Sequence, residues 1–442
     1  MHADLLTKLL ASIAADNLVV FCGAGLSMAA PSAVPSAKSV ATDTATKYAL
    51  QTGVALPAGA TTDLEILAEF ALGRGELRKL ILQKLIQWQP FTRNPNKGHF
   101  ALADFLASKI VQFGISTNFD TLVEMAAETL GEPLFEAALD GAEAIKALPH
   151  QPFLKIHGCC RRDKEETLWC RQQLTENTIK TRIASSKTWL NGQLKAKDLM
   201  FVGFWSDWDY LNTIIEDCIV ATEPSLVVLV DPMDAAGLKG KAPNLWNWAN
   251  SGKFLFHHER ESGADVLDEL RREFTIKFLE RLLAQAAATF IAMTGKAVPA
   301  TSFDRSKTSS DFYAMRRDYV GIPDSQIVRE KNPSNASAQI GAIHLRLLAK
   351  GATLDEPRFV LGADRLRVIQ GAGQALSLVQ KQFAGETPPS QPDQIVICAG
   401  AADDGGVPAH LVRGGLPPSV VRASGGGARW LTSEMAITQL GI

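Results

Sequence analysis

The chain has 442 residues, of which 46% are hydrophobic and 21% charged, so it is long enough for two or three globular domains with large cores. Its net charge of −2 carries no overall signature of nucleic-acid binding. The 6 cysteines are too few for a disulfide framework, and the first residues lack a signal-peptide layout, so we expect a cytoplasmic protein. The longest apolar run, residues 282–294, is shorter than the roughly 20 residues that cross a bilayer, so it predicts a buried helix and no membrane segment.

In chain order, a helical spacing of apolar residues over 4–15 comes first. Short apolar runs rich in β-branched residues then recur, with helical patterns between most of them, at 17–21, 109–117, 153–156, 198–202, 225–230 and 254–256. Strands that alternate with helices predict an α/β fold with a doubly wound, Rossmann-like parallel sheet. Polar residues cluster just after these strands, which is where such sheets bind ligands.

Two segments interrupt this alternation, and we interpret both as helical insertions that could fold together over the cleft. They span about 36–108 and about 167–194. A helical pattern runs from 265 to 293, and beyond 295 the chain becomes polar and rich in turn residues. We therefore predict a catalytic domain over 1–296 and a smaller C-terminal α+β module over 297–442.

Four loops after predicted strands carry the residues that could do chemistry. Gly23–Ser27 reads Gly-Ala-Gly-Leu-Ser, Thr117–Asp120 reads Thr-Asn-Phe-Asp, His157 is followed by glycine, and Gly203–Asp207 reads Gly-Phe-Trp-Ser-Asp. Glycines in the first loop would let backbone N–H groups approach a pyrophosphate. All four loops are expected at the carboxyl edge of the sheet.

Each loop alone also has an ordinary structural interpretation. The third glycine of the dinucleotide fingerprint is missing, since Met28 stands there, so the first loop could be a tight turn. Asn118 or Asp120 could cap the helix that begins near Thr121. His157 could be a structural histidine. The fourth loop could be a turn with a helix cap.

Taken together and in this order, the four loops resemble those of the sirtuin-like superfamily, and the resemblance covers about residues 5–275. Sirtuins that deacylate proteins carry two Cys-x-x-Cys pairs after the catalytic histidine, which bind a structural zinc. This chain has Cys159, Cys160 and Cys170 in that stretch, so neither pair is present. The resemblance therefore implies the bacterial branch without a zinc module, whose members hydrolyse NAD⁺ as antiviral effectors. It implies NAD⁺ as substrate and no bound metal.

The resemblance also suggests roles for individual residues. His157 would be the general base acting on a ribose hydroxyl or on water, for which an ordinary histidine pKa near 6.5 is suitable. Asn118 would orient the ribose or the water, and Asp120 would bind the nicotinamide carboxamide region or hold its loop. The expected cofactor contacts include Gly23, Ala24, Gly25 and Ser27 on the phosphates, Gly203, Ser206 and Asp231 on the adenosine half, and also Thr117 and Phe204.

The predicted function is an NAD⁺ glycohydrolase that acts in anti-phage defence by depleting NAD⁺. Since such an activity would poison its host if it were constitutive, we expect control through assembly or partner docking by residues 297–442. The resemblance implies a homo-oligomer and a partner such as a translocase ATPase or a short Argonaute. The alternatives are an NAD-dependent protein deacylase, a non-catalytic sensor of NAD⁺ or ADP-ribose, and a different nucleotide-binding α/β protein.

Overall fold

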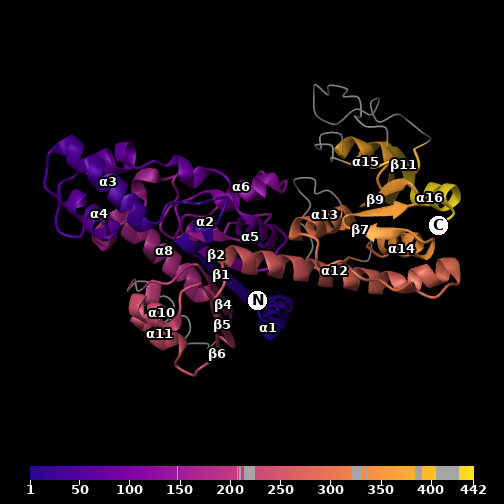
Figure 1. Ribbon diagram of the computed structural model, residues 1–442, viewed down its shortest axis with the longest axis horizontal. Helices are drawn as coiled ribbons and strands as arrows, with labels where there is room; N and C mark the ends of the chain where they lie inside the picture. The colour runs from indigo at the N-terminus through magenta and orange to yellow at the C-terminus, as the bar shows by residue number, and fades with distance from the viewer. Residues whose placement is uncertain are drawn as a thin grey trace. The chain divides into compact units, whose positions relative to one another are not determined.

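The computed structural model describes residues 1–442 except 147, 207, 209, 210, 214–223, 321–330, 335, 336, 384–390 and 405–427. The chain forms two compact units, Met1–Leu270 and Arg271–Ile442, and helix α12 (Gly263–Thr294) continues from the first into the second (Figure 1). Within the described part of the chain, no helix is long and apolar enough to cross a membrane.

A parallel sheet of six strands forms the centre of the first unit. The strands are β1 (Leu18–Cys22), β2 (Phe113–Ser116), β3 (Phe153–Lys155), β4 (Asp198–Val202), β5 (Leu226–Val230) and β6 (Leu255–Glu259). Their order is β3-β2-β1-β4-β5-β6, and each neighbouring pair is parallel. Every residue of β1 to β5 is buried, as expected for strands covered on both faces. The predicted doubly wound sheet is confirmed.

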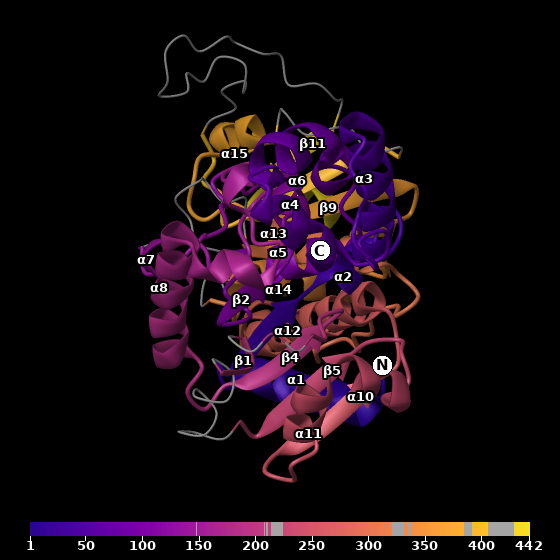
Figure 2. The ribbon, with the colours of Figure 1, turned by 90° about the vertical axis from the view of Figure 1, so that its left-hand side faces the viewer.

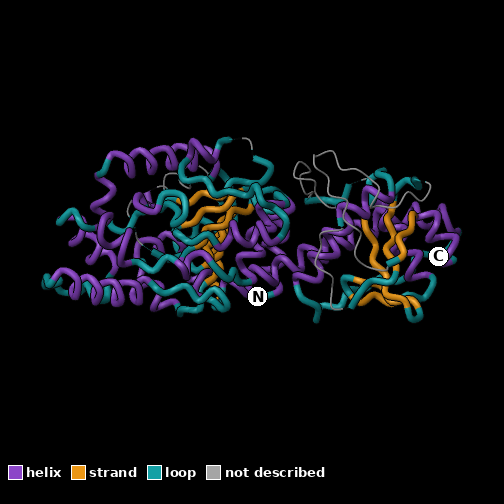
Figure 3. Tube along the Cα trace, turned by 90° about the horizontal axis from the view of Figure 1, so that it is seen from above, coloured by secondary structure: helices purple, strands orange, loops and turns teal. Residues whose placement is uncertain are grey.

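Helices flank this sheet (Figure 3). They are α1 (Ala3–Ala14), α2 (Ala24–Met28), α3 (Ala37–Thr52), α4 (Leu64–Gly73), the π-helix η1 (Leu77–Leu85), the 3₁₀ helix η2 (Gln89–Thr92), α5 (Lys97–Ala107), α6 (Leu122–Thr129), α7 (Gly141–Ala144), the 3₁₀ helices η3 (Lys164–Glu166) and η4 (Arg171–Thr175), α8 (Asn177–Gln193), α10 (Ala235–Lys241) and α11 (Pro243–Ala249). On one face, Trp189 of α8 packs edge-on against Phe113 of β2 at 5.0 Å between ring centroids, and α7 lies along α8 (Figure 2).

The two predicted insertions share one hydrophobic cluster. Tyr48 of α3, Leu67 of α4 and Ile81 of η1 pack with Trp169 and Cys170 of the second segment. An ion pair between Arg78 and Glu166 at 3.1 Å also joins the two segments. The expectation that they fold together is therefore met, and their shared core forms a small helical layer within the first unit.

Among its described residues, the second unit contains a mixed sheet and four further helices. The sheet order is β11 (Arg429–Thr432), β10 (Ile395–Ala399), β9 (Asp364–Gln370), β8 (Arg358–Leu361) and β7 (Thr353–Asp355). β9, β10 and β11 are parallel, whereas β7, β8 and β9 are antiparallel. The helices are α13 (Ser309–Val320), α14 (Ser337–Ala349), α15 (Leu376–Gln382) and α16 (Ser433–Leu440). This confirms the predicted α+β module.

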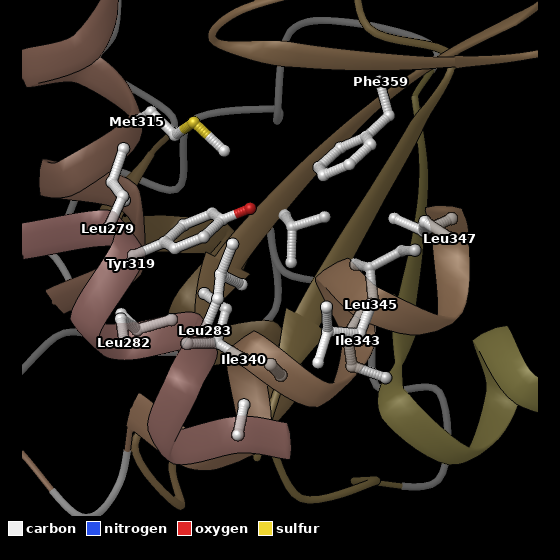
Figure 4. Packing of buried hydrophobic residues seen from close by; sticks show 14 of the residues in the cluster. Leu279, Leu282, Leu283, Met315, Tyr319, Ile340, Ile343, Leu345, Leu347 and Phe359 are labelled. Carbon is white, nitrogen blue, oxygen red and sulfur yellow. The ribbon is translucent and has the colours of Figure 1, made fainter. Parts of the chain in front are cut away.

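The core of the second unit lies where α12, α13 and α14 meet the sheet. Figure 4 shows Leu279 and Leu282 of α12, Tyr319 of α13, Ile340 of α14 and Phe359 of β8 around one apolar centre. The predicted buried helix over 282–294 is part of α12, and its Leu282 and Phe290 are fully buried here. The apolar run therefore supplies core packing in this unit.

Candidate active site

The strand order of the first sheet reverses direction between β1 and β4, and two glycine-containing loops meet at this point. The N–H of Gly23 donates to the carbonyl of Val202 at 3.1 Å, and the N–H of Gly25 donates to the carbonyl of Gly203 at 3.0 Å. A Cβ on Gly25 would lie 2.7 Å from the Cα of Gly203, so a side chain there would collide with backbone. These glycines allow the two loops to approach closely at the switch point, where doubly wound sheets bind ligands.

A cavity of about 550 Å³, open solvent at its mouth included, lies beside the first of these loops. Residues from the predicted motifs and from the helical layer line it together: Ala24, Ser27, Val34, Pro35, Ala37, Val40, Leu64, Phe91, Thr117, Asn118, Phe119, Asp120 and Trp169. Five predicted site residues thus meet in one cavity: Ala24, Ser27, Thr117, Asn118 and Asp120.

Ser27 holds this group together through a buried hydrogen-bond network. Its hydroxyl donates to Oδ2 of Asp120 at 2.8 Å and accepts from Nδ2 of Asn118 at 3.1 Å. Nε2 of His99 lies 3.1 Å from the same oxygen. Nδ1 of His99 accepts from the backbone N–H of Asn96 at 3.1 Å, so Nε2 carries the proton and donates to Ser27. Burial lowers the pKa of His99 to about 4, which keeps the imidazole neutral.

Asp120 also fixes the start of α6. Its Oδ1 accepts from the backbone N–H of Leu122 at 3.2 Å, and its carbonyl oxygen accepts from Nζ of Lys155. Asp120 is not the N-cap of α6, which is Thr121, but its side chain accepts from the first N–H of the helix. Asp120 was predicted either to bind the nicotinamide carboxamide region or to hold its loop, and these contacts favour the second role.

His157 lies in the turn after β3, two residues beyond Lys155, and its ring is near that of Phe119, which lines the cavity. Its ring lies 6.5 Å from the ring of Phe119 and 5.1 Å from that of Trp208, between centroids. It is not among the described residues that line the cavity. Burial, helped by the positive charge of Arg182, lowers the pKa of His157 to about 3. The expectation that His157 has an ordinary histidine pKa near 6.5 is therefore wrong for the protein without a ligand.

The other predicted cofactor contacts lie along the same edge but outside this cavity. The ring of Phe204 is buried in the core, 6.2 Å from that of Phe201, and Ser206 is half-buried. The carboxylate of Asp231 accepts from the backbone N–H of Met233 at 2.9 Å. Asp207, the last residue of the fourth motif, is outside the described residues.

Sequence reasoning did not predict two features of this site. One is His99, which comes from α5 within the predicted insertion. The other is an aromatic wall, in which Phe119 stacks on Trp169 with centroids 4.8 Å apart and planes at 18°, and to which Phe91 also contributes. The only local signal is the pairing of Asn96 with His99 as a capping box, which predicts a helix start and nothing more.

The sheet order, the switch-point loops and the adjacent cavity define a doubly wound, Rossmann-like ligand-binding protein. The family model described as the SIR2-like domain matches residues 113–251, so this segment is a SIR2-like domain and the predicted resemblance to the sirtuin-like superfamily is confirmed there. The match begins at β2 and therefore does not include the glycine loop. No curated protein matches the chain.

Solved structures similar to this chain include two Sir2 complexes. A Sir2 homologue bound to NAD is 16% identical, with a TM-score of 0.38, and the match covers 61% of this chain and 93% of that one. A Sir2 protein bound to an inhibitor, 2'-O-acetyl-ADP-ribose and a deacetylated peptide is 12% identical, with a TM-score of 0.35, and the match covers 60% of this chain and 98% of that one.

Proposed function

We propose that the first unit binds NAD⁺ in the cavity beside Asn118 and hydrolyses the nicotinamide–ribose bond, releasing nicotinamide and ADP-ribose. The observation that carries this proposal is the position of Asn118. It lines a cavity next to the switch point, and Ser27 holds its side-chain amide at 3.1 Å. Since Ser27 is itself bonded to Asp120 and His99, the amide is fixed before any ligand arrives.

The lining of the cavity suits the nicotinamide end of the substrate. The pyridinium ring is flat and positively charged, and aromatic faces attract cations. Phe91, Phe119 and Trp169 supply aromatic surface, while Asp120 supplies a carboxylate. As the bond to ribose breaks, positive charge moves from the pyridinium to the ribose, and nicotinamide leaves as a neutral molecule. A preorganised carboxylate and amide oxygen stabilise this charge without having to reorient.

His157 is neutral at pH 7, so it can accept a proton, but a pKa of about 3 makes it a weak base. A dinucleotide carries two negatively charged phosphate groups, and negative charge near an imidazole raises its pKa. We therefore propose that His157 acts as general base only in the complex. In a titration of the wild-type protein by nuclear magnetic resonance, saturating ADP-ribose should raise the pKa of His157. An unchanged pKa would contradict this role.

The decisive experiment follows nicotinamide and ADP-ribose by chromatography after incubation of the purified full-length chain with NAD⁺. Wild type should release both products, and Asn118→Ala should lose about 10²-fold or more of the rate, the size expected when a positioned group next to the reacting atoms is removed. Asn247→Ala is the matched control, because Asn247 is exposed on α11. Equal rates for Asn118→Ala and the control would refute the proposed site.

The same assay separates the other two functions that the resemblance implies. Nicotinamide release that requires an acyl-lysine peptide would point to a protein deacylase, and NAD⁺ binding without turnover would point to a sensor.

From the resemblance alone we also propose a role in anti-phage defence, a homo-oligomer, and a translocase ATPase or short Argonaute as partner, with residues 297–442 for docking. Mass photometry with and without the partner tests the assembly, and a monomer in both samples would contradict it.

A further inference from the structure

A second cavity of about 740 Å³, open solvent at its mouth included, lies on the first unit and is not part of the proposed NAD⁺ site. Pro133, Leu134, Arg161 and Arg162 line it and are exposed, so the cavity opens to solvent between them. Cys159 also lines it, although its side chain is almost fully buried. A small molecule that enters this cavity therefore lies beside Cys159.

The surroundings of Cys159 stabilise a thiolate. Nζ of Lys155 donates to its sulfur at 3.9 Å. Although burial disfavours the ammonium of Lys155, the carboxylate of Glu124 raises its pKa, so the positive charge is present. The neighbouring thiol of Cys160, together with the positive charge of Lys155 and against the effect of burial, lowers the pKa of Cys159 below that of an ordinary thiol.

Cys160 connects this thiolate to the other cavity. Its backbone N–H donates to the carbonyl of Phe119 at 2.8 Å, and its side chain packs with Val34, Phe91 and Leu122. Val34, Phe91 and Phe119 line the proposed NAD⁺ cavity. A covalent change at Cys160 therefore acts directly on the wall of that cavity.

We propose that Cys159 and Cys160 form a redox modification site, in which a small hydroperoxide oxidises Cys159 and Cys160 closes a vicinal disulfide. The Cys159 thiolate attacks the terminal oxygen of the hydroperoxide, the O–O bond breaks, and the alkoxide takes a proton, leaving a sulfenic acid and an alcohol. The Cys160 thiol then loses its proton and attacks the sulfur of Cys159. The S–O bond of the sulfenic acid breaks, and its hydroxide takes up a proton and leaves as water. Two thiols and one hydroperoxide thus give one disulfide, one alcohol and one water.

The disulfide should be easily reduced. Adjacent Cα atoms are about 3.8 Å apart, which is below the usual span of a disulfide, about 4.4–6.8 Å, and strained disulfides are more reducible. A dithiol reductant therefore reverses the modification, so the site can report the peroxide level.

Three other cysteines serve as internal controls. Cys22, Cys170 and Cys398 are buried, and burial raises their pKa values to about 12, 11 and 12. They should stay reduced under conditions that oxidise Cys159, because the thiolate is the form that reacts with peroxides. Cys218 is outside the described residues.

The test treats the full-length protein with a small excess of hydrogen peroxide, blocks the remaining thiols with iodoacetamide, and analyses the peptides by mass spectrometry. The peptide with Cys159 and Cys160 should lose two hydrogens and escape alkylation, and dithiothreitol should reverse this. In Cys160→Ser, a sulfenic acid at Cys159 should be trapped by dimedone. In Cys159→Ser, Cys160 should remain a thiol. Oxidation of Cys170 as fast as that of Cys159 would overturn the proposal.

A measurement on the wild type alone covers the case in which a variant does not fold. The rate of alkylation of Cys159 by iodoacetamide should level off at a lower pH than that of an ordinary thiol, which keeps rising to about pH 8.5. A rate for Cys159 that rises over the whole range, or labelling only in urea, would show that no accessible thiolate exists here and would sink the proposal.

Discussion

The buried histidine His157 should make the first unit sensitive to acid. Its pKa is about 3 in the folded protein and about 6.5 in an unfolded chain. Between these two values the unfolded state binds a proton that the folded state does not, so the contribution to stability is complete above pH 6.5 and is lost as the pH falls. Each such proton changes the free energy of unfolding by about 1.4 kcal/mol per pH unit. From pH 7 to pH 5, His157 alone should therefore cost about 2 kcal/mol.

The substitution His157→Asn isolates this contribution, because asparagine does not titrate. Urea unfolding of the full chain at pH 7, 6 and 5 can be followed by tryptophan fluorescence, which reports mainly on the first unit, since all tryptophans except Trp430 lie there. The stability lost between pH 7 and pH 5 should be about 2 kcal/mol smaller in His157→Asn than in wild type. Other titrating groups cancel in this comparison. His2→Asn, at an exposed position, is the control and should behave as wild type.

If wild type and His157→Asn lost the same stability on acidification, the imidazole would have to be protonated or hydrated in the folded protein. The burial argument, and with it the view that a ligand must restore the basicity of His157, would then be refuted. A difference close to 2 kcal/mol at pH 5 that disappears at pH 7 would support both.

Three further substitutions test packing and polar contacts by urea unfolding. Ser27→Ala should cost about 2–4 kcal/mol, because it leaves the buried Asp120 and His99 and the half-buried Asn118 without their shared partner, and a cost below about 0.5 kcal/mol would contradict the network. Gly25→Ala should cost about 1–3 kcal/mol, because its Cβ would lie 2.7 Å from the Cα of Gly203. Gly192→Ala in α8, where nothing lies within 4 Å, is the matched control and should be neutral or stabilising. In the second unit, Asp318→Asn should cost about 3–5 kcal/mol, since it removes the carboxylate that the buried Arg358 and Arg367 share, and an unchanged stability would contradict these two ion pairs.

The strands and their loops could be predicted because buried parallel strands are continuous apolar runs that end in polar or glycine residues. The run at 109–117 shows the limit of this pattern. Only Phe113–Ser116 is a strand, while Ile110 donates from its backbone N–H to the carbonyl of Phe105 at 2.7 Å, closing the end of α5. Ile110 and Val111 are apolar because they are buried in this turn. Periodicity cannot separate buried turn residues from a buried strand.

The cavity itself could not be predicted, because it depends on contacts between distant parts of the chain. His99 meets Ser27 across 72 residues, from a helix that the sequence suggests only as part of an insertion. Trp169 reaches the cavity from the second insertion in the same way. The pKa of His157 likewise depends on how completely the fold buries it. These are properties of tertiary packing, and only two of the four motifs, Gly23–Ser27 and Thr117–Asp120, contribute residues that line the cavity.

The Ser27 network also sets the polarity of the site. Because the hydroxyl of Ser27 donates to Asp120, its oxygen must accept from Asn118, so the amide nitrogen of Asn118 points to Ser27. The carbonyl oxygen of Asn118 is then the atom that this side chain can offer to a ligand. Together with the carboxylate of Asp120, it makes this side of the cavity rich in acceptors. Such a site favours ribose hydroxyls, water and developing positive charge over carbonyl oxygens, which is the selectivity that cleavage of a ribosyl–pyridinium bond requires.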